Sequence, residues 1–225
     1  MTLLIKMKMK INKNTEGLET RNFNASELRV ENQESREVVG YASVFTDADG
    51  NPALSENLGG FREIINPNAF DSCLLDENLD CRMLINHDAN LILGRTSANT
   101  LSLSVDSRGL KYSFTVPETT YGNDLMISLT RGDISQNSFG FIVEDDDWSQ
   151  SEDGSTIRTI NKVSRLLDCS VVTYPAYPDA TIGKRNFLDY KTQLEKTENE
   201  KQQKDLIKRN LQELKIKLLK LKNQK

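Results

Sequence analysis

The sequence predicts an α+β fold: a closed or nearly closed, mostly antiparallel β-barrel with a few flanking helices and a C-terminal amphipathic helix. Three observations predict this fold class. Many short β-rich segments are separated by turn-forming residues, which is typical of barrels and sandwiches. Two short stretches instead place apolar residues at helical spacing. The end of the chain, residues 189–225, contains no Gly or Pro and carries a long helical pattern.

The N-terminal segment, residues 1–36, is predicted to be weakly ordered. It mixes Lys, Asn, Glu and Thr with few aromatic residues, so it offers little apolar surface to bury. Within it, only residues 23–30 form a candidate strand that could pair with a later one. We expect the ordered body to span residues 37–185 and a basic helical tail to span residues 186–225.

The body begins with a β-rich run at residues 38–45, which ends at the turn formers of residues 47–52. Apolar spacing over residues 67–76 and 121–131 predicts two peripheral helices, and Gly132 after a basic residue is typical of a helix end. The other predicted strands are residues 84–85, 101–105, 110–116, 139–143, 156–163 and 170–174.

The tail is separated from the body by Pro175 and Pro178, which exclude a central strand or a helix interior at that point. Its apolar residues then follow a spacing of 4, 3, 4 and 3, which is the a/d spacing of a short coiled coil. These residues are Ile207, Leu211, Leu214, Leu218 and Leu221. We expect the seam over residues 207–221 to dock to a partner helix, through self-association.

Charge is distributed unevenly along the chain. Residues 191–225 carry 11 Lys and Arg against 5 Asp and Glu, whereas residues 1–190 carry 18 against 28. An acidic body is poorly suited to neutralising phosphates, so the body is not expected to bind nucleic acid. The basic face of the tail leaves nucleic acid open as an alternative to the partner helix there, with the partner helix favoured.

The three cysteines, Cys73, Cys81 and Cys169, form no C-x-x-C pair, and their odd number does not suggest a disulfide framework. They fit a reducing cytosol. No apolar run approaches the roughly 18 residues of a membrane helix, and the N-terminus lacks a signal-peptide core, so we expect a soluble protein. Cys73, Cys81 and His87 lack the spacing of a zinc site, and no metal or cofactor is implied.

His87 is the only histidine in the chain and directly follows a predicted strand. A group that moves protons near neutral pH would have to be this one. A structural histidine with a hydrogen-bonded ring is the alternative, and for a lone histidine it is the more frequent case.

Ser138 begins the segment Ser138-Phe139-Gly140-Phe141, where a loop after a predicted helix enters a strand. A nucleophile suits the start of a rigid strand, beside a glycine that lets a substrate backbone approach. The same residues also suit a tight strand entry with both aromatic rings in the core, and residue type alone favours that interpretation.

Asp168 lies between apolar neighbours at the start of a predicted strand. Burying an aspartate requires a hydrogen-bond donor, and a histidine ring N–H would supply one while fixing the tautomer that a serine nucleophile needs. A salt bridge to Arg165 is the alternative. Cys169 follows in the same strand, so alternation should turn it to the opposite face, buried and inert.

The order His, Ser, Asp excludes the chymotrypsin-like, subtilisin-like and α/β-hydrolase families, and no G-x-S-x-G elbow is present. Over residues 38–182 the chain resembles the tailed-phage prohead (capsid-maturation) serine proteases, which are distantly similar to the herpesvirus protease assemblin. The segments that carry the resemblance are residues 40–45, 66–70, 86–88, 93–95, 106–110, 132–141 and 168–178.

The resemblance implies that His87 is the general base, Ser138 the nucleophile and Asp168 the third catalytic residue. The family often has glutamate at the third position, so Glu144 and Asp88 remain substitutes for Asp168. Asn68 and Asn137 also depart from the family, which usually has glycine and an apolar residue there. By analogy with assemblin, backbone amides of the loop after Val172 are candidate oxyanion donors.

The resemblance further implies an endopeptidase of the host bacterial cytoplasm, acting inside the assembling procapsid. Its substrates would be the scaffolding segment of the major capsid protein and its own tail. The alternative is a catalytically inactive scaffolding or procapsid-interaction protein that acts through its C-terminal helix. Reaction of Ser138 with a serine-directed phosphonate distinguishes the two.

Overall fold

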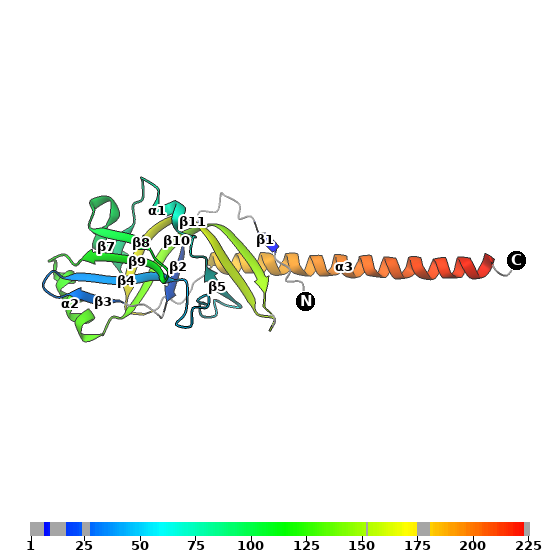
Figure 1. Ribbon diagram of the computed structural model, residues 1–225, viewed down its shortest axis with the longest axis horizontal. Helices are drawn as coiled ribbons and strands as arrows, with labels where there is room; N and C mark the ends of the chain where they lie inside the picture. The colour runs from blue at the N-terminus through cyan, green and yellow to red at the C-terminus, as the bar shows by residue number, and fades with distance from the viewer. Residues whose placement is uncertain (1–6, 10–16, 24–27, 152, 175–180, 223–225) are drawn as a thin grey trace. The chain divides into compact units, whose positions relative to one another are not determined.

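The computed structural model of the chain describes residues 7–9, 17–23, 28–151, 153–174 and 181–222 (Figure 1). Contacts divide the chain into two units, Met1–Lys184 and Arg185–Lys225. The first contains two β-sheets and two short helices, and most of the long helix α3 (Thr181–Lys222) forms the second. The fold class is therefore α+β, with a C-terminal helix, as the sequence predicts.

The larger sheet has seven strands, with β10 (Gln136–Gln150) and β11 (Thr156–Val172) at its centre. These two long strands form an antiparallel hairpin, and the other strands pair with one or the other, or with β6. The remaining strands are β1 (Met7–Met9), β2 (Glu19–Phe23), β5 (Phe61–Ile65), β6 (Arg82–Ile85) and β7 (Asp88–Arg95).

The smaller sheet has four antiparallel strands in the order β3-β4-β9-β8. Their bounds are β3 (Arg29–Asn32), β4 (Glu37–Val44), β8 (Leu101–Val105) and β9 (Gly109–Thr115). Within the described ranges no strand pairs across the two sheets, so the predicted closed barrel is not confirmed. Two pairs in the larger sheet, β11 with β5 and β11 with β6, are parallel.

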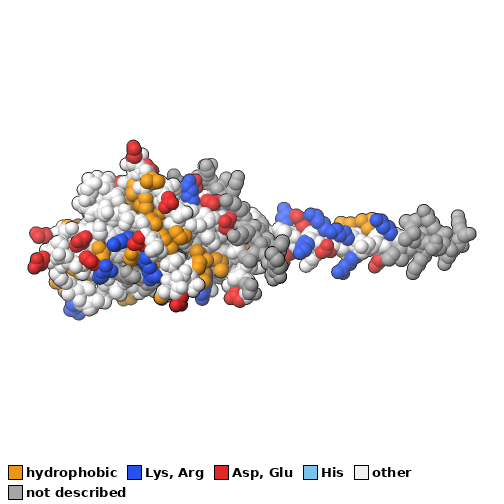
Figure 2. Space-filling model, in the orientation of Figure 1, with side chains coloured by type: hydrophobic (Ala, Val, Ile, Leu, Met, Phe, Trp, Pro, Cys, Tyr) orange, Lys and Arg blue, Asp and Glu red, His pale blue; other side chains and the backbone are white. Residues whose placement is uncertain are grey.

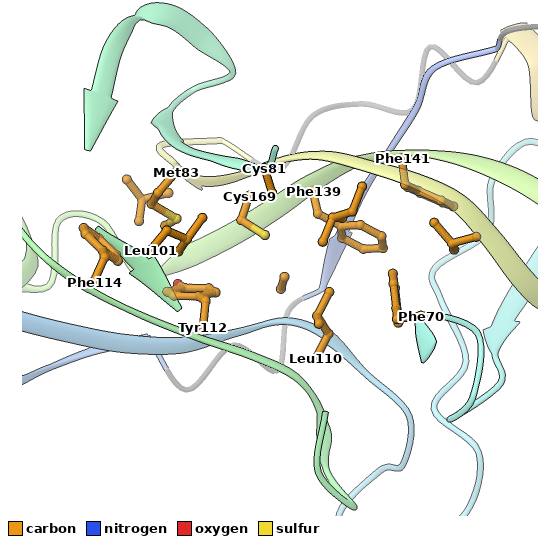
Figure 3. Close-up of a cluster of buried hydrophobic side chains, with 14 of the residues drawn as sticks. Phe70, Cys81, Met83, Leu101, Leu110, Tyr112, Phe114, Phe139, Phe141 and Cys169 are labelled. Carbon is orange, nitrogen blue, oxygen red and sulfur yellow. The ribbon is translucent and has the colours of Figure 1, made fainter. Parts of the chain in front are cut away.

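The hydrophobic core contains buried side chains from both sheets (Figure 3). Phe139 and Cys169 come from the β10–β11 hairpin, and the stacked rings of Phe139 and Phe141 have centroids 4.6 Å apart. Tyr112 of β9 donates a hydrogen bond from its hydroxyl to Asn137 Oδ1 at 2.5 Å. The Tyr112 hydroxyl lies where a side chain on Gly40 would be, so this glycine allows the bond.

Two short helices and a 3₁₀ turn connect the strands: α1 (Asp71–Leu74), η1 (Thr96–Ala98) and α2 (Thr120–Arg131). The start of α2 is capped by Thr119, whose hydroxyl oxygen accepts the Gly122 N–H at 3.1 Å. Its end is the left-handed Gly132, with φ of 81°, which confirms the predicted helix and its stop. Among the residues described, no helix combines the length and apolar character needed to cross a membrane.

A buried cluster of five charged side chains attaches β2 to the larger sheet. Arg21 contacts Glu19 and Glu63, and Arg158 contacts Glu19, Glu63 and Asp146, the last at 2.5 Å. All five side chains are less than 5% exposed. The sequence offered no apolar signal for β2 at Glu19 and Arg21, because these buried residues are charged and their other partners, Glu63 and Arg158, lie in distant strands.

Opposite charges set the ionisation of this cluster. Burial alone would raise the pKa of Glu63, but the charges and hydrogen bonds of Arg21 and Arg158 outweigh burial and lower it. Glu63 therefore stabilises the fold at neutral pH, and that contribution is lost as the pH falls through the lowered pKa. For Asp146 burial outweighs the charge of Arg158, and its pKa is raised.

The substitution Arg158→Met should destabilise the protein by about 3–5 kcal/mol, because it leaves three buried carboxylates with a single arginine. The matched control is Lys162→Met on the same hairpin, which removes a 3.0 Å ion pair with Glu144 whose side chains are 43% and 36% exposed. Its expected cost is about 0–1 kcal/mol. Urea unfolding of both variants measures the difference, and equal midpoints would contradict the role given to the cluster.

Candidate active site

His87 lies at the tip of the tight turn between β6 and β7. Ile85 pairs with Asp88, so Asn86 and His87 are the two turn residues, and their φ angles are 53° and 59°. Two positive φ angles are the signature of a type I′ hairpin turn, which asparagine tolerates but which costs a histidine about 1–2 kcal/mol. Asn86 secures the turn to the end of β11, since its Oδ1 accepts the Thr173 N–H at 2.9 Å.

Ser138 and Asp168 lie on the same face of the β10–β11 hairpin. Ser138 pairs with Ser170, and Gly140 pairs with Asp168, so the four residues occupy alternate positions on two adjacent strands. Phe139 and Cys169, at the intervening positions, belong to the hydrophobic core on the other face. The strands thus separate an apolar face from a face that carries hydroxyl and carboxyl groups.

The structure brings His87, Ser138 and Asp168 together. His87 Nε2 lies 2.7 Å from Ser138 Oγ, and His87 Nδ1 lies 2.6 Å from Asp168 Oδ1. An ionised carboxylate only accepts hydrogen bonds, so Nδ1 carries the ring proton and Nε2 accepts the serine hydroxyl proton. This is the arrangement in which a histidine can remove a proton from a serine.

The three side chains differ in exposure. Ser138 is 0% exposed, whereas the side chains of Asp168 and His87 are 13% and 22% exposed. A buried setting strengthens the hydrogen bonds of a polar network. It also means that the Ser138 hydroxyl is closed to solvent in this conformation, so a substrate carbonyl can reach it only after neighbouring atoms move.

Gly140 makes room for the carboxyl group of Asp168. A Cβ added at Gly140 would lie 2.5 Å from Asp168 Oδ2 and 3.4 Å from Leu18 Cδ1. The sequence suggested that this glycine admits a substrate backbone, and the structure supplies a different reason for it. The carboxyl group fills the space that a larger residue would take.

The alternatives for the third residue have other hydrogen-bond or ion-pair partners. Glu144 forms an ion pair with Lys162, and Asp88 accepts hydrogen bonds from Asn90 at 2.9 Å. The side chain of Asp168 binds His87 and Ser170 rather than Arg165, which is exposed. For the expected oxyanion donors, the Thr173 amide is already bound to Asn86, and residues 175–180 lie outside the described residues.

The three cysteines are structural, and the described residues form no metal site. Cys73, Cys81 and Cys169 are free and buried. A hydrogen bond with Cys81 and burial raise the pKa of the Cys169 thiol well above its usual value, and burial raises that of Cys73 to about 11. Within the described ranges, no group of three or more His, Cys, Asp or Glu side chains is placed to hold a metal ion.

Sequence reasoning missed Ser170. Its hydroxyl lies 2.9 Å from Asp168 Oδ1, and its Oγ is 3.2 Å from the His87 backbone nitrogen. Serine is too common in strands to be singled out by type. The one signal in the sequence was its position two residues after Asp168, which puts both side chains on one face of a strand.

The substitution Gly140→Ala should displace the Asp168 carboxyl group and break its hydrogen bond with the His87 ring. Because His87 is the only histidine, ¹⁵N-histidine labelling gives a single imidazole spectrum in which the bonded Nδ1–H is followed directly. The control Gly132→Ala costs about 1–2 kcal/mol of backbone strain but has no atom within 4 Å of the added methyl. Loss of the Nδ1–H signal is expected in the first variant alone, and its persistence there would contradict the packing described.

Comparison with known proteins places the chain in a family. A family model described as Caudovirus prohead serine protease matches residues 23–199. The chain is also 28% identical over 177 residues to the prohead protease of Enterobacteria phage HK97, covering 76% of this chain and 70% of that protein. No solved structure matches the chain significantly. The family model spans more than half of the chain, including His87, Ser138 and Asp168, and the chain therefore belongs to the Caudovirus prohead serine protease family.

Proposed function

We propose that the protein is a serine endopeptidase in which Ser138 is the nucleophile, His87 the general base and Asp168 the residue that holds the base. The pair of hydrogen bonds from His87, at 2.7 Å to Ser138 and 2.6 Å to Asp168, is the observation that supports this most directly. No other histidine exists in the chain to take the same part.

The proposed reaction follows from this geometry. Ser138 Oγ attacks a peptide carbonyl while its proton passes to His87 Nε2, and Asp168 stabilises the imidazolium that forms. His87 then returns the proton to the leaving amine, which leaves Ser138 acylated. Water, activated by the same histidine, attacks the acyl group and restores the free enzyme. Each proton movement passes through His87 Nε2, and the last one returns the proton to Ser138 Oγ as the acid product leaves.

The proposed substrate is the scaffolding segment of the major capsid protein inside the assembling procapsid, with the protein's own tail as a second substrate. Support comes from the family model and from the relative in phage HK97, both described as prohead proteases. The assembled hydrogen bonds at Ser138 favour this enzyme over an inactive scaffolding protein, which has no need of them.

The substitution Ser138→Ala tests the nucleophile and the substrate together. Wild type and variant are co-expressed with the cognate major capsid protein, and intact mass spectrometry measures the capsid subunit. We expect a shortened subunit with wild type and a full-length one with Ser138→Ala, because the hydroxyl that forms the acyl-enzyme is gone. Full-length subunits with both proteins, in shells that still assemble, would support the inactive scaffolding protein instead.

We also propose that α3 self-associates through the seam over residues 207–221. Ile207, Leu211 and Leu214 follow the a/d spacing and are 59%, 52% and 57% exposed. Figure 2 shows hydrophobic side chains gathered on this stretch of α3 among Lys and Arg. A second copy offers the same seam and so matches it in length and spacing. Leu218 and Leu221 continue the pattern, although their side chains lie outside those described.

The substitution Leu211→Glu should weaken self-association at least about tenfold, because burying an unpaired carboxylate in a coiled-coil seam costs more than about 1.4 kcal/mol. Gln212→Glu adds the same charge one position away, outside the a/d seam, and should have little effect. Sedimentation equilibrium of the full chain measures both. A monomeric wild type, or equal dissociation constants for the two variants, would exclude the seam as the contact.

A further inference from the structure

Ser170 contacts both His87 and Asp168 through a single oxygen. Its Oγ lies 2.9 Å from Asp168 Oδ1, 3.2 Å from the backbone nitrogen of His87 and 3.4 Å from His87 Nδ1. The residue is 0% exposed, and it pairs directly with Ser138 across the hairpin. Its hydroxyl therefore lies inside the group formed by His87, Ser138 and Asp168.

The direction of each hydrogen bond follows from the donors available. The hydroxyl of Ser170 has one hydrogen, and an ionised Asp168 can only accept, so Ser170 donates to Asp168 Oδ1. The oxygen lone pairs then accept the His87 backbone N–H. Ser170 thus links the carboxyl group and the backbone of the histidine with two bonds that run in one direction.

The turn that carries His87 is strained and needs contacts such as these bonds to hold it in place. Its backbone has a positive φ, which is strained for a histidine and persists only where surrounding contacts hold it. The hydrogen bond from the His87 backbone N–H to Ser170 holds the turn beside Ser138, the residue that pairs with Ser170. The bond from Ser170 to Asp168 fixes the carboxyl oxygen that receives the ring Nδ1–H, and so fixes the rotation of the ring.

We propose that Ser170 is a positioning residue, which orients the His87 ring toward Ser138 by holding both the turn and Asp168. The proposal rests on the proposed function of His87 and Ser138. In this proposal Ser170 neither contacts the substrate nor transfers a proton during the reaction. Loss of its hydroxyl should leave the three catalytic side chains present but poorly aligned.

The test uses three variants of the full chain. Ser170→Ala removes the hydroxyl, and Ser170→Thr restores an oxygen at the same position. Ser164→Ala is the matched control, because Ser164 lies on the same strand and donates a hydrogen bond to the Ile142 carbonyl at 3.2 Å, away from His87. Thermal melting of each variant establishes that the proteins compared are folded.

Two measurements are made on each protein. Intact mass spectrometry follows the rate of covalent labelling by a fluorophosphonate, with peptide mapping to Ser138. NMR of ¹⁵N-histidine reports which nitrogen of the single imidazole carries the proton. If Ser170 only supported the strand, removing its hydroxyl would leave the tautomer of His87 unchanged. If Ser170 holds Asp168, removing its hydroxyl should change the tautomer.

We expect Ser170→Ala to be labelled about 10–100-fold more slowly than wild type, as for a misaligned general base, and to show a mixture of tautomers. Ser170→Thr should recover most of the rate, and Ser164→Ala should stay within about twofold of wild type. Labelling of Ser170→Ala at the wild-type rate, or no recovery in Ser170→Thr, would overturn the proposal.

The two hypotheses fail in different ways. A folded wild type that the fluorophosphonate does not label contradicts the proposed function. In that case the NMR measurement still tests the positioning role of Ser170. An unchanged His87 tautomer in Ser170→Ala overturns this role, and a mixture of tautomers supports it.

Discussion

The pairing of β10 with β11 is the interaction on which both the core and the candidate active site depend. Its register sets Ser138 opposite Ser170 and Gly140 opposite Asp168. A shift by one residue would exchange the two faces of a strand and send Ser138 into the core in place of Phe139. Burial of the aromatic residues favours the observed register, and that register places the hydroxyl and carboxyl groups of Ser138, Asp168 and Ser170 on the opposite face of the hairpin.

The β10–β11 hairpin contains no histidine, and the neighbouring strands position His87 and complete the sheet. The parallel pairing of β6 with β11 places the turn that carries His87 above the hairpin, and the bond from Asn86 to Thr173 holds it there. At the other edge of β10, β2 contributes Glu19 and Arg21 to the cluster of five buried charges. Removing one partner of such a cluster costs much more than removing one partner of an exposed ion pair, so a pairing of β2 that left these charges without partners would be strongly destabilised.

Much of the fold could be predicted from the sequence, and the reasons for the failures are physical. Alternation and turn formers predicted β8 at its observed bounds and β4 to within one residue, and the helix-end signal at Gly132 was correct. The strand pattern could not show that residues 156–172 form one strand, because bulges interrupt its alternation. It also could not show whether the sheets close, since closure depends on pairings between distant strands.

The residues of the candidate site were predicted from a resemblance, because spacing alone left His87, Ser138 and Asp168 each with a structural alternative. The structure brings these three together. It adds Ser170 and a new reason for Gly140. The reason for Gly140 could not be predicted, since the Asp168 carboxyl group that it accommodates lies in the neighbouring strand. The spacing of Ser170 from Asp168 was a signal in the sequence, but its contacts with His87 depend on the distant β6–β7 turn. Asn137, which departs from the family, is buried and bonded to Tyr112, so its polarity is satisfied in the core.

The hydrogen bonds of His87 join residues 51 and 81 positions apart in the chain. Contacts of such sequence separation form only after long loops have closed, and they are characteristic of slowly folding proteins. Neither the β10–β11 hairpin alone nor the β6–β7 turn alone contains a serine bonded to a histidine. A partly synthesised or partly folded chain consequently carries an ordinary serine hydroxyl, and only completion of the sheet brings Ser138 to His87.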